Sequence, residues 1–459
     1  MFSKIMSNNS RAAVLDLTHG GAVIARKLKN IAASVTGVDV YRTLSSDELG
    51  ALETEGIKTS QEPLNTSDFE IIIAPVHLDP AYPMLVDAAK NNIPVVSHHA
   101  AVGEILSGRQ KDRTIIEITG TRAKTSTALL LAEMLSGEKK VVSHTSRGVE
   151  DWSGRRIIKN GLSITPASIL LALEAVDEEG LKPDVIIFEV SLGGTGSADI
   201  GVITTIADDY KIANNTGLAS DAKRSMILDA KPGSALVINH DALRCFGACR
   251  RDVNIISFSD SVNAAANVYY ENLSAGGGTI AYYLDDRQGK IAVSASEEYD
   301  ITSYKTAFVC AAAVALAMDI KPAAIERSFR KFKGAQGRMR KTSIEGRTLI
   351  DNSNSGLSIR SAEKALEYAK TESGRIVMVL GEEAKEVCEG LDPKGVERFI
   401  DKRLDEIHAL VLVGERMKPL VSKNINKIYH AGNLSKGIEF AQQLTGEKDI
   451  IVSCVKCFR

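Results

Sequence analysis

Short runs of branched apolar residues alternate along this chain with segments of helical length, and this alternation predicts parallel α/β sheets. An Ala-rich run over 306–320 has the composition of a buried helix. Further helices are predicted over 22–28, 128–135 and 361–368. The predicted strands are 12–17, 34–41, 70–74 and 93–96, then 114–118, 185–188, 202–206 and 235–238, and finally 348–350, 375–380, 409–413 and 450–452.

The pattern divides the chain into three α/β domains. We predict a Rossmann-like N-terminal domain over 1–108, a central P-loop ATPase-like domain over 109–336 and a C-terminal Rossmann-like domain over 337–459. The polar segment Ser107–Asp112 marks the first boundary, and the Gly-containing turn Lys333–Gly337 marks the second. A chain of 459 residues is too long for one hydrophobic core, which agrees with several domains.

The turn between the predicted strand 114–118 and the following helix has the composition of a phosphate-binding loop. In such a loop, backbone N–H groups at a helix N-terminus face the phosphates. Lys124 would reach the outer phosphates, and the hydroxyl of Thr125 would hold Mg2+. Ala123 stands where the usual motif has a second glycine, so an ordinary strand-to-helix turn capped by a threonine remains the alternative. The candidate nucleotide-binding residues are Gly120, Thr121, Arg122, Ala123, Lys124, Thr125 and Ser126.

Acidic residues follow two of the central strands. Glu189 comes directly after the strand 185–188, and Asp208 and Asp209 follow the strand 202–206. Open α/β sheets bind ligands at the carboxyl ends of their strands, so Glu189 is a candidate Mg2+ ligand. Each feature taken singly also fits a helix cap.

In this order the motifs resemble those of the Mur ligase family, ATP-dependent amide-forming enzymes, over essentially the whole chain. Ile118–Ser126 resembles the family loop ITGTNGKTT, Glu189–Ser191 resembles ExSS, and Ile203–Tyr210 resembles LTNITEDH. Asp221–Lys223 lies at the place of a family lysine that is carbamylated. Gly337-Arg338 with Leu349–Asp351 is similar to the GR…IDD pair that begins the C-terminal domain.

The resemblance implies roles for particular residues, with ATP and Mg2+ as cofactors. Lys124 and Thr125 would hold phosphate and Mg2+, Glu189 would hold metal, and carbamylated Lys223 would support a second metal. Arg338 and Asp351 would close over the nucleotide from the third domain. The implied catalytic residues are Lys124, Lys223 and Arg338, and the implied metal ligands are Thr125, Glu189 and Lys223.

The implied reaction moves the γ-phosphoryl group of ATP onto a carboxylate, and a nucleophile then attacks the acyl phosphate. The chain departs from the family at Tyr210, where a metal-binding histidine is usual, and at Ser303–Ala307, which lacks the asparagine that contacts adenine. We find no amino-acid-recognition motif in the last domain.

The pattern is most similar to a branch of the family, found in methanogenic archaea, that activates a propionate on a nickel tetrapyrrole and closes a ring within that molecule. Nickel would enter only as part of this small-molecule substrate. The alternatives are an amino-acid-adding ligase of cell-wall or polyglutamate synthesis, and a nucleotide-binding regulatory protein without ligase activity.

The first domain offers candidate contacts for the substrate. Thr18–Gly21 is a glycine-rich turn comparable with the one that binds a UDP-sugar in the muramyl ligases. Several side chains could face a macrocycle or its carboxylates, although loop histidines and solvated surface cations are the plainer interpretation: His77, His98, His99, Arg26, Lys27 and Arg147.

Composition narrows the function classes. The net charge is −2 with 25% charged residues, which gives no electrostatic reason to expect nucleic acid or a membrane surface as partner. The run 306–320 is too short to span a bilayer. The first ten residues lack an apolar signal segment and the six cysteines suit a reducing compartment, so we expect a cytoplasmic protein. Cys454 and Cys457 form a CxxC without a second pair at metal-site spacing, so a half zinc site or redox pair is the less favoured interpretation.

Overall fold

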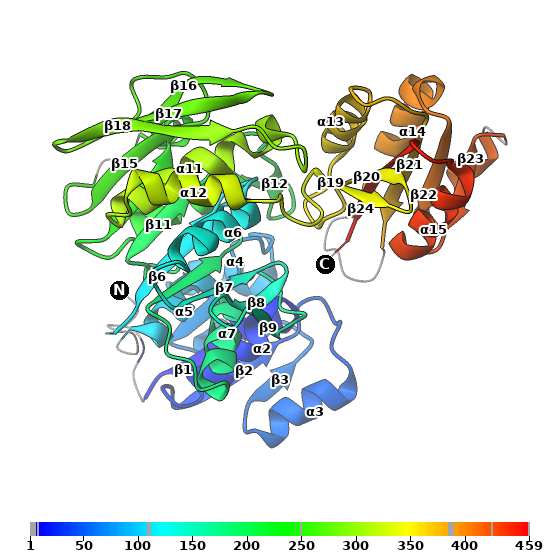
Figure 1. Ribbon diagram of the computed structural model, residues 1–459. Helices are drawn as coiled ribbons and strands as arrows, with labels where there is room; N and C mark the ends of the chain where they lie inside the picture. Colours follow the sequence, from blue (N-terminus) through cyan, green and yellow to red (C-terminus); the bar gives the residue numbers. More distant parts are fainter. Residues whose placement is uncertain are drawn as a thin grey trace. The chain divides into compact units, whose positions relative to one another are not determined.

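The computed structural model describes residue 6 and residues 9–107, 112–247, 250–383, 390–423 and 426–457. Most of the predicted linker, residues 108–111, lies outside these ranges. The chain contains three large sheets (Figure 1). It divides into two compact units, of which the first comprises 1–271, 280–291 and 306–325 and the second 272–279, 292–305 and 326–459.

The N-terminal sheet has five parallel strands in the order β3-β2-β1-β4-β5. The chain moves from β1 to one side and then returns to add β4 and β5 on the other, so the strand order reverses at β1. The strands are β1 (Arg11–Leu15), β2 (Ser34–Val38), β3 (Lys58–Ser60), β4 (Ile71–Ala74) and β5 (Val95–Ser97), and the helices are α2 (Ala22–Leu28), α3 (Ser46–Thr54), α4 (Pro83–Asn91) and α5 (His98–Leu106).

The central sheet has eleven strands in the order β18-β17-β16-β15-β14-β11-β6-β10-β7-β8-β9. Its middle strands are parallel and their residues are buried, which explains their continuous apolar runs. The strands are β6 (Thr114–Thr119), β7 (Val141–Thr145), β8 (Gly148–Asp151), β9 (Arg156–Lys159), β10 (Val185–Glu189), β11 (Ile200–Ile203), β14 (Ala235–Asn239), β15 (Asn254–Ser259), β16 (Val268–Ser274), β17 (Gly277–Leu284) and β18 (Arg287–Ser294).

The helices of this region are α6 (Lys124–Leu135), α7 (Pro166–Glu178), α8 (Ala219–Lys223), α9 (Ser225–Leu228), α10 (His240–Phe246), α11 (Lys305–Ala317) and α12 (Pro322–Lys331), with a short ribbon of β12 (Lys211–Ile212) and β13 (Gly217–Leu218). Residues 307–316 of α11 are buried, which confirms the predicted interior helix. In the described part of the chain, no helix is long and apolar enough to cross a membrane.

One apolar core joins the N-terminal sheet to the central sheet within the first unit. Helices α2 and α5 pack against α7. The cluster contains Ile24 and Ile105 from the N-terminal helices together with Ile169 of α7 and Phe188 of β10. The two sheets therefore share a hydrophobic core.

The C-terminal sheet has the order β19-β20-β24-β21-β22-β23, parallel except for the β19–β20 hairpin. Apolar clusters cover both faces. The strands are β19 (Arg340–Ile344), β20 (Arg347–Asp351), β21 (Ile376–Glu382), β22 (Ala409–Val413), β23 (Ile428–Ala431) and β24 (Ile450–Lys456), and the helices are α13 (Ile359–Ala369), α14 (Pro393–Arg403) and α15 (Leu434–Leu444).

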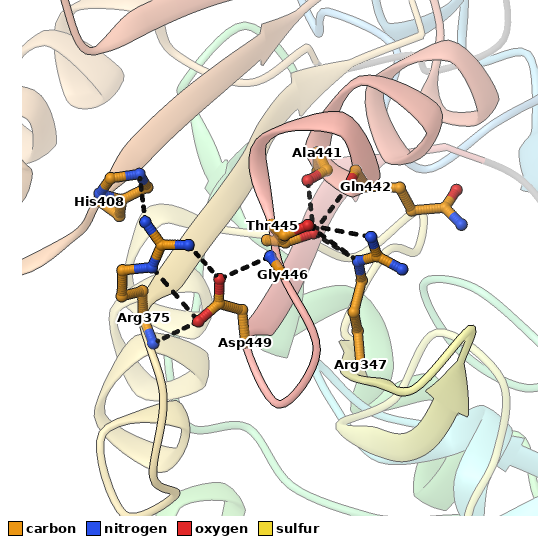
Figure 2. A network of polar contacts seen from close by, with 8 residues as sticks. All are labelled: Arg347, Arg375, His408, Ala441, Gln442, Thr445, Gly446 and Asp449. Atoms are coloured by element: carbon orange, nitrogen blue, oxygen red, sulfur yellow. Dashed lines mark hydrogen bonds and ion pairs between the residues drawn. The ribbon is translucent and has the colours of Figure 1, made fainter.

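A polar network holds the amino ends of these strands (Figure 2). The Asp449 carboxylate accepts from Nη2 of Arg375 at 2.8 Å and from the N–H of Gly446 at 2.8 Å. Burial raises the pKa of Asp449, but these hydrogen bonds outweigh burial and lower the pKa below its ordinary value. The carboxylate is therefore ionised at neutral pH. Nη2 of Arg347 donates to the carbonyl of Thr445 at 2.9 Å. The network stabilises the edge opposite the carboxyl ends of the strands.

Three predicted strands extend too far, and each difference has a local cause. The strand predicted over 12–17 ends at Leu15, because the next residue, Asp16, has a left-handed backbone. The strand predicted over 34–41 ends at Val38, and the next residue, Asp39, accepts from the N–H groups of Thr43 and Leu44, which turns the chain. The strand predicted over 202–206 leaves the sheet after Ile203. Its next residues contact the candidate phosphate loop instead, as described below. The strands β16, β17 and β18 at one edge of the central sheet are among those that were not predicted.

Candidate active site

Strand β6 lies between β10 and β11 and is parallel to both. The carboxyl ends of the three strands therefore meet at one edge of the sheet. Gly120 follows β6, Glu189 ends β10 and Thr204 follows β11. This edge is where open α/β sheets bind ligands.

The loop after β6 adopts the backbone that its glycine permits. Gly120 has φ 145°, and a Cβ there would lie 2.0 Å from Oγ1 of Thr204. Ala123 has φ 63° and ψ 0°, the left-handed conformation, at the N-cap of α6. An alanine, at the position where the usual motif has a glycine, therefore adopts a left-handed backbone at a cost in strain.

The residues after β11 hold the loop in place. The N–H of Thr121 donates to the carbonyl of Thr205 at 2.8 Å. Oγ1 of Thr204 donates to the carbonyl of Arg122, whose guanidinium pairs with Asp208 at 3.0 Å. The loop is thus fixed by hydrogen bonds to a neighbouring strand end.

Lys124 and Thr125 begin α6, where the first backbone N–H groups of a helix lack intrahelical partners. The Lys124 ammonium donates to the carbonyl of Gly120 at 3.1 Å, so its side chain folds back over the loop. Together with the helix N-terminus, this arrangement concentrates positive charge at the loop, which suits phosphate groups.

The hydroxyl of Thr125 donates to the Glu189 carboxylate, at 3.0 and 2.9 Å from its two oxygens. The N–H of Ser146 also donates to Glu189, at 3.2 Å. The side chains of Thr125 and Glu189 are buried. A hydroxyl and a carboxylate oxygen are donors of the kind that Mg2+ prefers, so these residues fit that ion.

Lys223 ends α8 and is 1% exposed. Its ammonium donates to the carbonyl of Ala219 at 3.4 Å and lies 5.2 Å from the ring centroid of Tyr210. Burial and, to a smaller extent, the charge of Lys124 lower the pKa of Lys223 to about 7, against the opposing effect of Asp209. A large fraction of the amine is therefore neutral at neutral pH.

The structure places Arg338 and Asp351 in the second unit. The Asp351 carboxylate accepts from the N–H of Gly337 at 2.9 Å, and Gly337 has φ 72°. The phenol of Tyr304 donates to the carbonyl of Arg338. Asp351 therefore holds the turn that carries Arg338, and Tyr304 is a supporting residue that sequence reasoning missed.

The predicted histidines separate into two groups. His98 and His99 are buried, and burial lowers the pKa of each to about 4. Nε2 of His98 contacts the carbonyl of Leu15 at 2.9 Å, and Nε2 of His99 contacts that of Ser191 at 2.7 Å. Such buried rings do not suit contact with a macrocycle. His77, by contrast, is 30% exposed.

Other candidate residues from the sequence form surface ion pairs or pack in the apolar core, and their contacts give no sign of a binding site. Arg26 pairs with Glu55 and Lys27 with Glu174. Cys454 and Cys457 are buried in separate apolar clusters, which does not support a shared metal or redox site.

Comparison with known proteins identifies relatives of this chain. Residues 341–457 match the family described as Coenzyme F430 synthetase CfbE, C-terminal domain. The sequence is 45% identical to the Coenzyme F(430) synthetase of Methanosarcina acetivorans, over 98% of this chain and 99% of the relative. It is 23% identical to the UDP-N-acetylmuramoylalanine--D-glutamate ligase of Enterococcus faecalis, over 98% of this chain and 92% of the relative.

In structure, the chain resembles the MurF ligase of Thermotoga maritima solved in complex with ADP. The TM-score is 0.52 at 14% sequence identity, over 100% of this chain and 93% of that chain. This likeness confirms the predicted α/β fold class.

The left-handed Ala123 generates a stability prediction. Ala123→Gly should raise the free energy of unfolding by about 0.5–1 kcal/mol. Glycine removes the left-handed strain of the folded state, and the higher conformational entropy of glycine in the unfolded chain offsets part of this stabilisation. Ala128→Gly, in the interior of the same helix, should lower it by about 1 kcal/mol or more. Urea unfolding of the three proteins measures both changes. Equal destabilisation by the two substitutions would contradict the assigned backbone at Ala123.

Proposed function

This chain belongs to the coenzyme F(430) synthetase family of Mur-type ligases, and on this basis we propose how its individual residues act. It is an ATP-dependent ligase that closes a ring of a nickel tetrapyrrole. The predicted family, ligase activity and ring-closing branch are confirmed. The amino-acid-adding ligase and the inactive regulatory protein are set aside.

The reaction needs an activated carboxylate, because a carboxylate has a delocalised charge and a poor leaving group. Phosphoryl transfer from ATP gives an acyl phosphate and ADP. A nucleophile of the same molecule then attacks the carbonyl carbon, phosphate leaves, and the nucleophile loses a proton. The sum of the two steps removes one water from the substrate.

The phosphate loop positions the transferred group in this proposal. Lys124 and the N-terminus of α6 bind the outer phosphates, and positioning with charge neutralisation supplies most of the catalysis. Thr125 and Glu189 hold Mg2+, which neutralises phosphate charge when bound. The observation that carries this assignment is the contact between the Thr125 hydroxyl and Glu189 beside the loop.

Lys223 is proposed to act as a carbamate. Its neutral amine attacks the carbon of CO2, an N–C bond forms and a proton is released. The product is an anion that supplies an oxygen ligand. Support comes from its burial and the lowered pKa, which keep the amine nucleophilic at neutral pH.

Arg338 is proposed to bind the nucleotide from the C-terminal domain, on the turn held by Asp351. In this proposal the division into 1–108, 109–336 and 337–459 allows closure that excludes water from the acyl phosphate. The N-terminal domain takes the tetrapyrrole carboxylate.

The ring closure has a direct test. The purified enzyme with ATP, Mg2+ and a nickel tetrapyrrole propionic acid should release ADP and phosphate with no added amine. Mass spectrometry should find a product lighter than the substrate by one water, and its absorption should shift as the ring carbonyl forms. A strict requirement for an amino acid that appears in the product would overturn this reaction.

Lys124→Ala should lower the rate of ADP formation at least about a hundredfold, because it removes the cation that faces the transferred phosphate. The thermal unfolding midpoint should change little, since the side chain lies over the loop and outside the apolar core. Lys182→Ala, at an exposed position, is the control and should retain activity. A fully active Lys124→Ala enzyme would remove the nucleotide assignment.

The carbamate should be visible by 13C NMR with labelled bicarbonate. Its signal should grow as the pH rises through about 7, because the folded-state pKa of Lys223 lies there and only the neutral amine reacts. Lys223→Ala should lose the signal and the activity, with partial recovery of activity on adding a short carboxylic acid. Lys182→Ala should keep both. An unchanged spectrum in Lys223→Ala would refute the modification.

A further inference from the structure

Three potential metal ligands meet in the N-terminal sheet. Asp16 follows β1, His19 lies in the turn Leu17–Gly21, and His77 lies beyond the end of β4. Strands β1 and β4 are parallel neighbours, and the strand order reverses at β1. Open α/β sheets bind ligands at the carboxyl ends beside such a reversal.

The ligand atoms face one another at metal-site separations. Nδ1 of His19 lies 2.9 Å and Nε2 of His77 lies 3.4 Å from Oδ2 of Asp16. One ligand atom from each residue lies within 4.8 Å of the others. A metal bound about 2.1 Å from each donor sets neighbouring donors about 3.0–3.4 Å apart. Small rotations of the two rings therefore suffice to surround an ion.

The charge at this cluster favours a cation. The side chain of Asp16 is fully buried, and its ion pairs among the described residues are to the imidazoles of His19 and His77. A buried carboxylate is best compensated by a full positive charge, which a bound metal ion would supply.

The backbone holds the carboxylate in an unusual conformation. Asp16 has φ 64° and ψ 76°, and its Oδ1 accepts from the N–H of His19 at 3.1 Å. A Cβ at Gly21 would lie 2.3 Å from the carbonyl oxygen of Asp16, so the turn depends on that glycine. Strained backbone of this kind gathers at functional sites because the surrounding structure must enforce it.

We propose that Asp16, His19 and His77 bind a divalent first-row transition-metal ion. Two imidazoles with one carboxylate suit Zn2+, Fe2+ or Co2+, whereas Mg2+ and Ca2+ prefer oxygen donors alone. Three protein ligands leave at least one position for water or a carboxylate. The macrocycle of the substrate already holds its nickel, so the ion proposed here is a separate one.

The test is a Co2+ titration of the full-length, tag-free chain after metal removal with a chelator. One equivalent should bind with visible d–d absorption and should be displaced by Zn2+. His19→Ala and His77→Ala should each weaken Co2+ binding at least about a hundredfold, because even residues that only orient metal ligands contribute 10- to 100-fold. His408→Ala, which removes an exposed histidine of the C-terminal sheet, should bind Co2+ like the unaltered chain.

His77→Gln serves as a second variant at the more exposed histidine, and thermal unfolding checks that each variant is folded. The absence of site-dependent Co2+ absorption, or its persistence in folded His19→Ala and His77→Gln, would overturn the proposal. So would a chain that binds no Co2+ but changes the absorption of a nickel tetrapyrrole through His19. The titration uses neither ATP nor tetrapyrrole, so its failure is distinct from a failure of the proposed ligase mechanism.

Discussion

The parallel pairing of β6 with β10 on one side and β11 on the other is the constraint on which the proposed nucleotide site depends. It brings Glu189 to the hydroxyl of Thr125 and sets Thr204 against Gly120. A register shift of one residue would turn Glu189 to the opposite face of the sheet. The chemistry of the loop is therefore fixed by strand pairing as much as by the loop sequence.

The part of the site that lies within short motifs could be predicted from the sequence. Lys124 and Thr125 begin the helix that follows one strand, and Glu189 ends another, so local pattern was enough to predict them as candidates. The cluster of Asp16 and His77 could not be found this way, because it depends on β1 and β4 being neighbours although they are distant in sequence. Asp16 was predicted to lie inside a strand, yet its left-handed backbone ends that strand.

Contacts that residues of other segments make with the site could not be predicted from the sequence for the same reason. Ser146 reaches Glu189 through its backbone N–H, which any residue type except proline could provide. Thr204 and Thr205, which contact the loop, were predicted to lie in a strand. An apolar, β-branched run does not show where the backbone stops pairing with the neighbouring strands. Domain bounds rest on such long-range contacts too, and they stay a prediction.

The shared core of the N-terminal and central sheets has an evolutionary consequence. Ile105 and Phe188 belong to one apolar cluster, and His99 reaches the carbonyl of Ser191, two residues beyond Glu189. A new N-terminal sheet acquired by recombination would have to bring a matching apolar face and an imidazole at that position. Changes of substrate in this lineage should therefore arise by gradual replacement of loop residues on an inherited sheet, while the packed face opposite them keeps its shape.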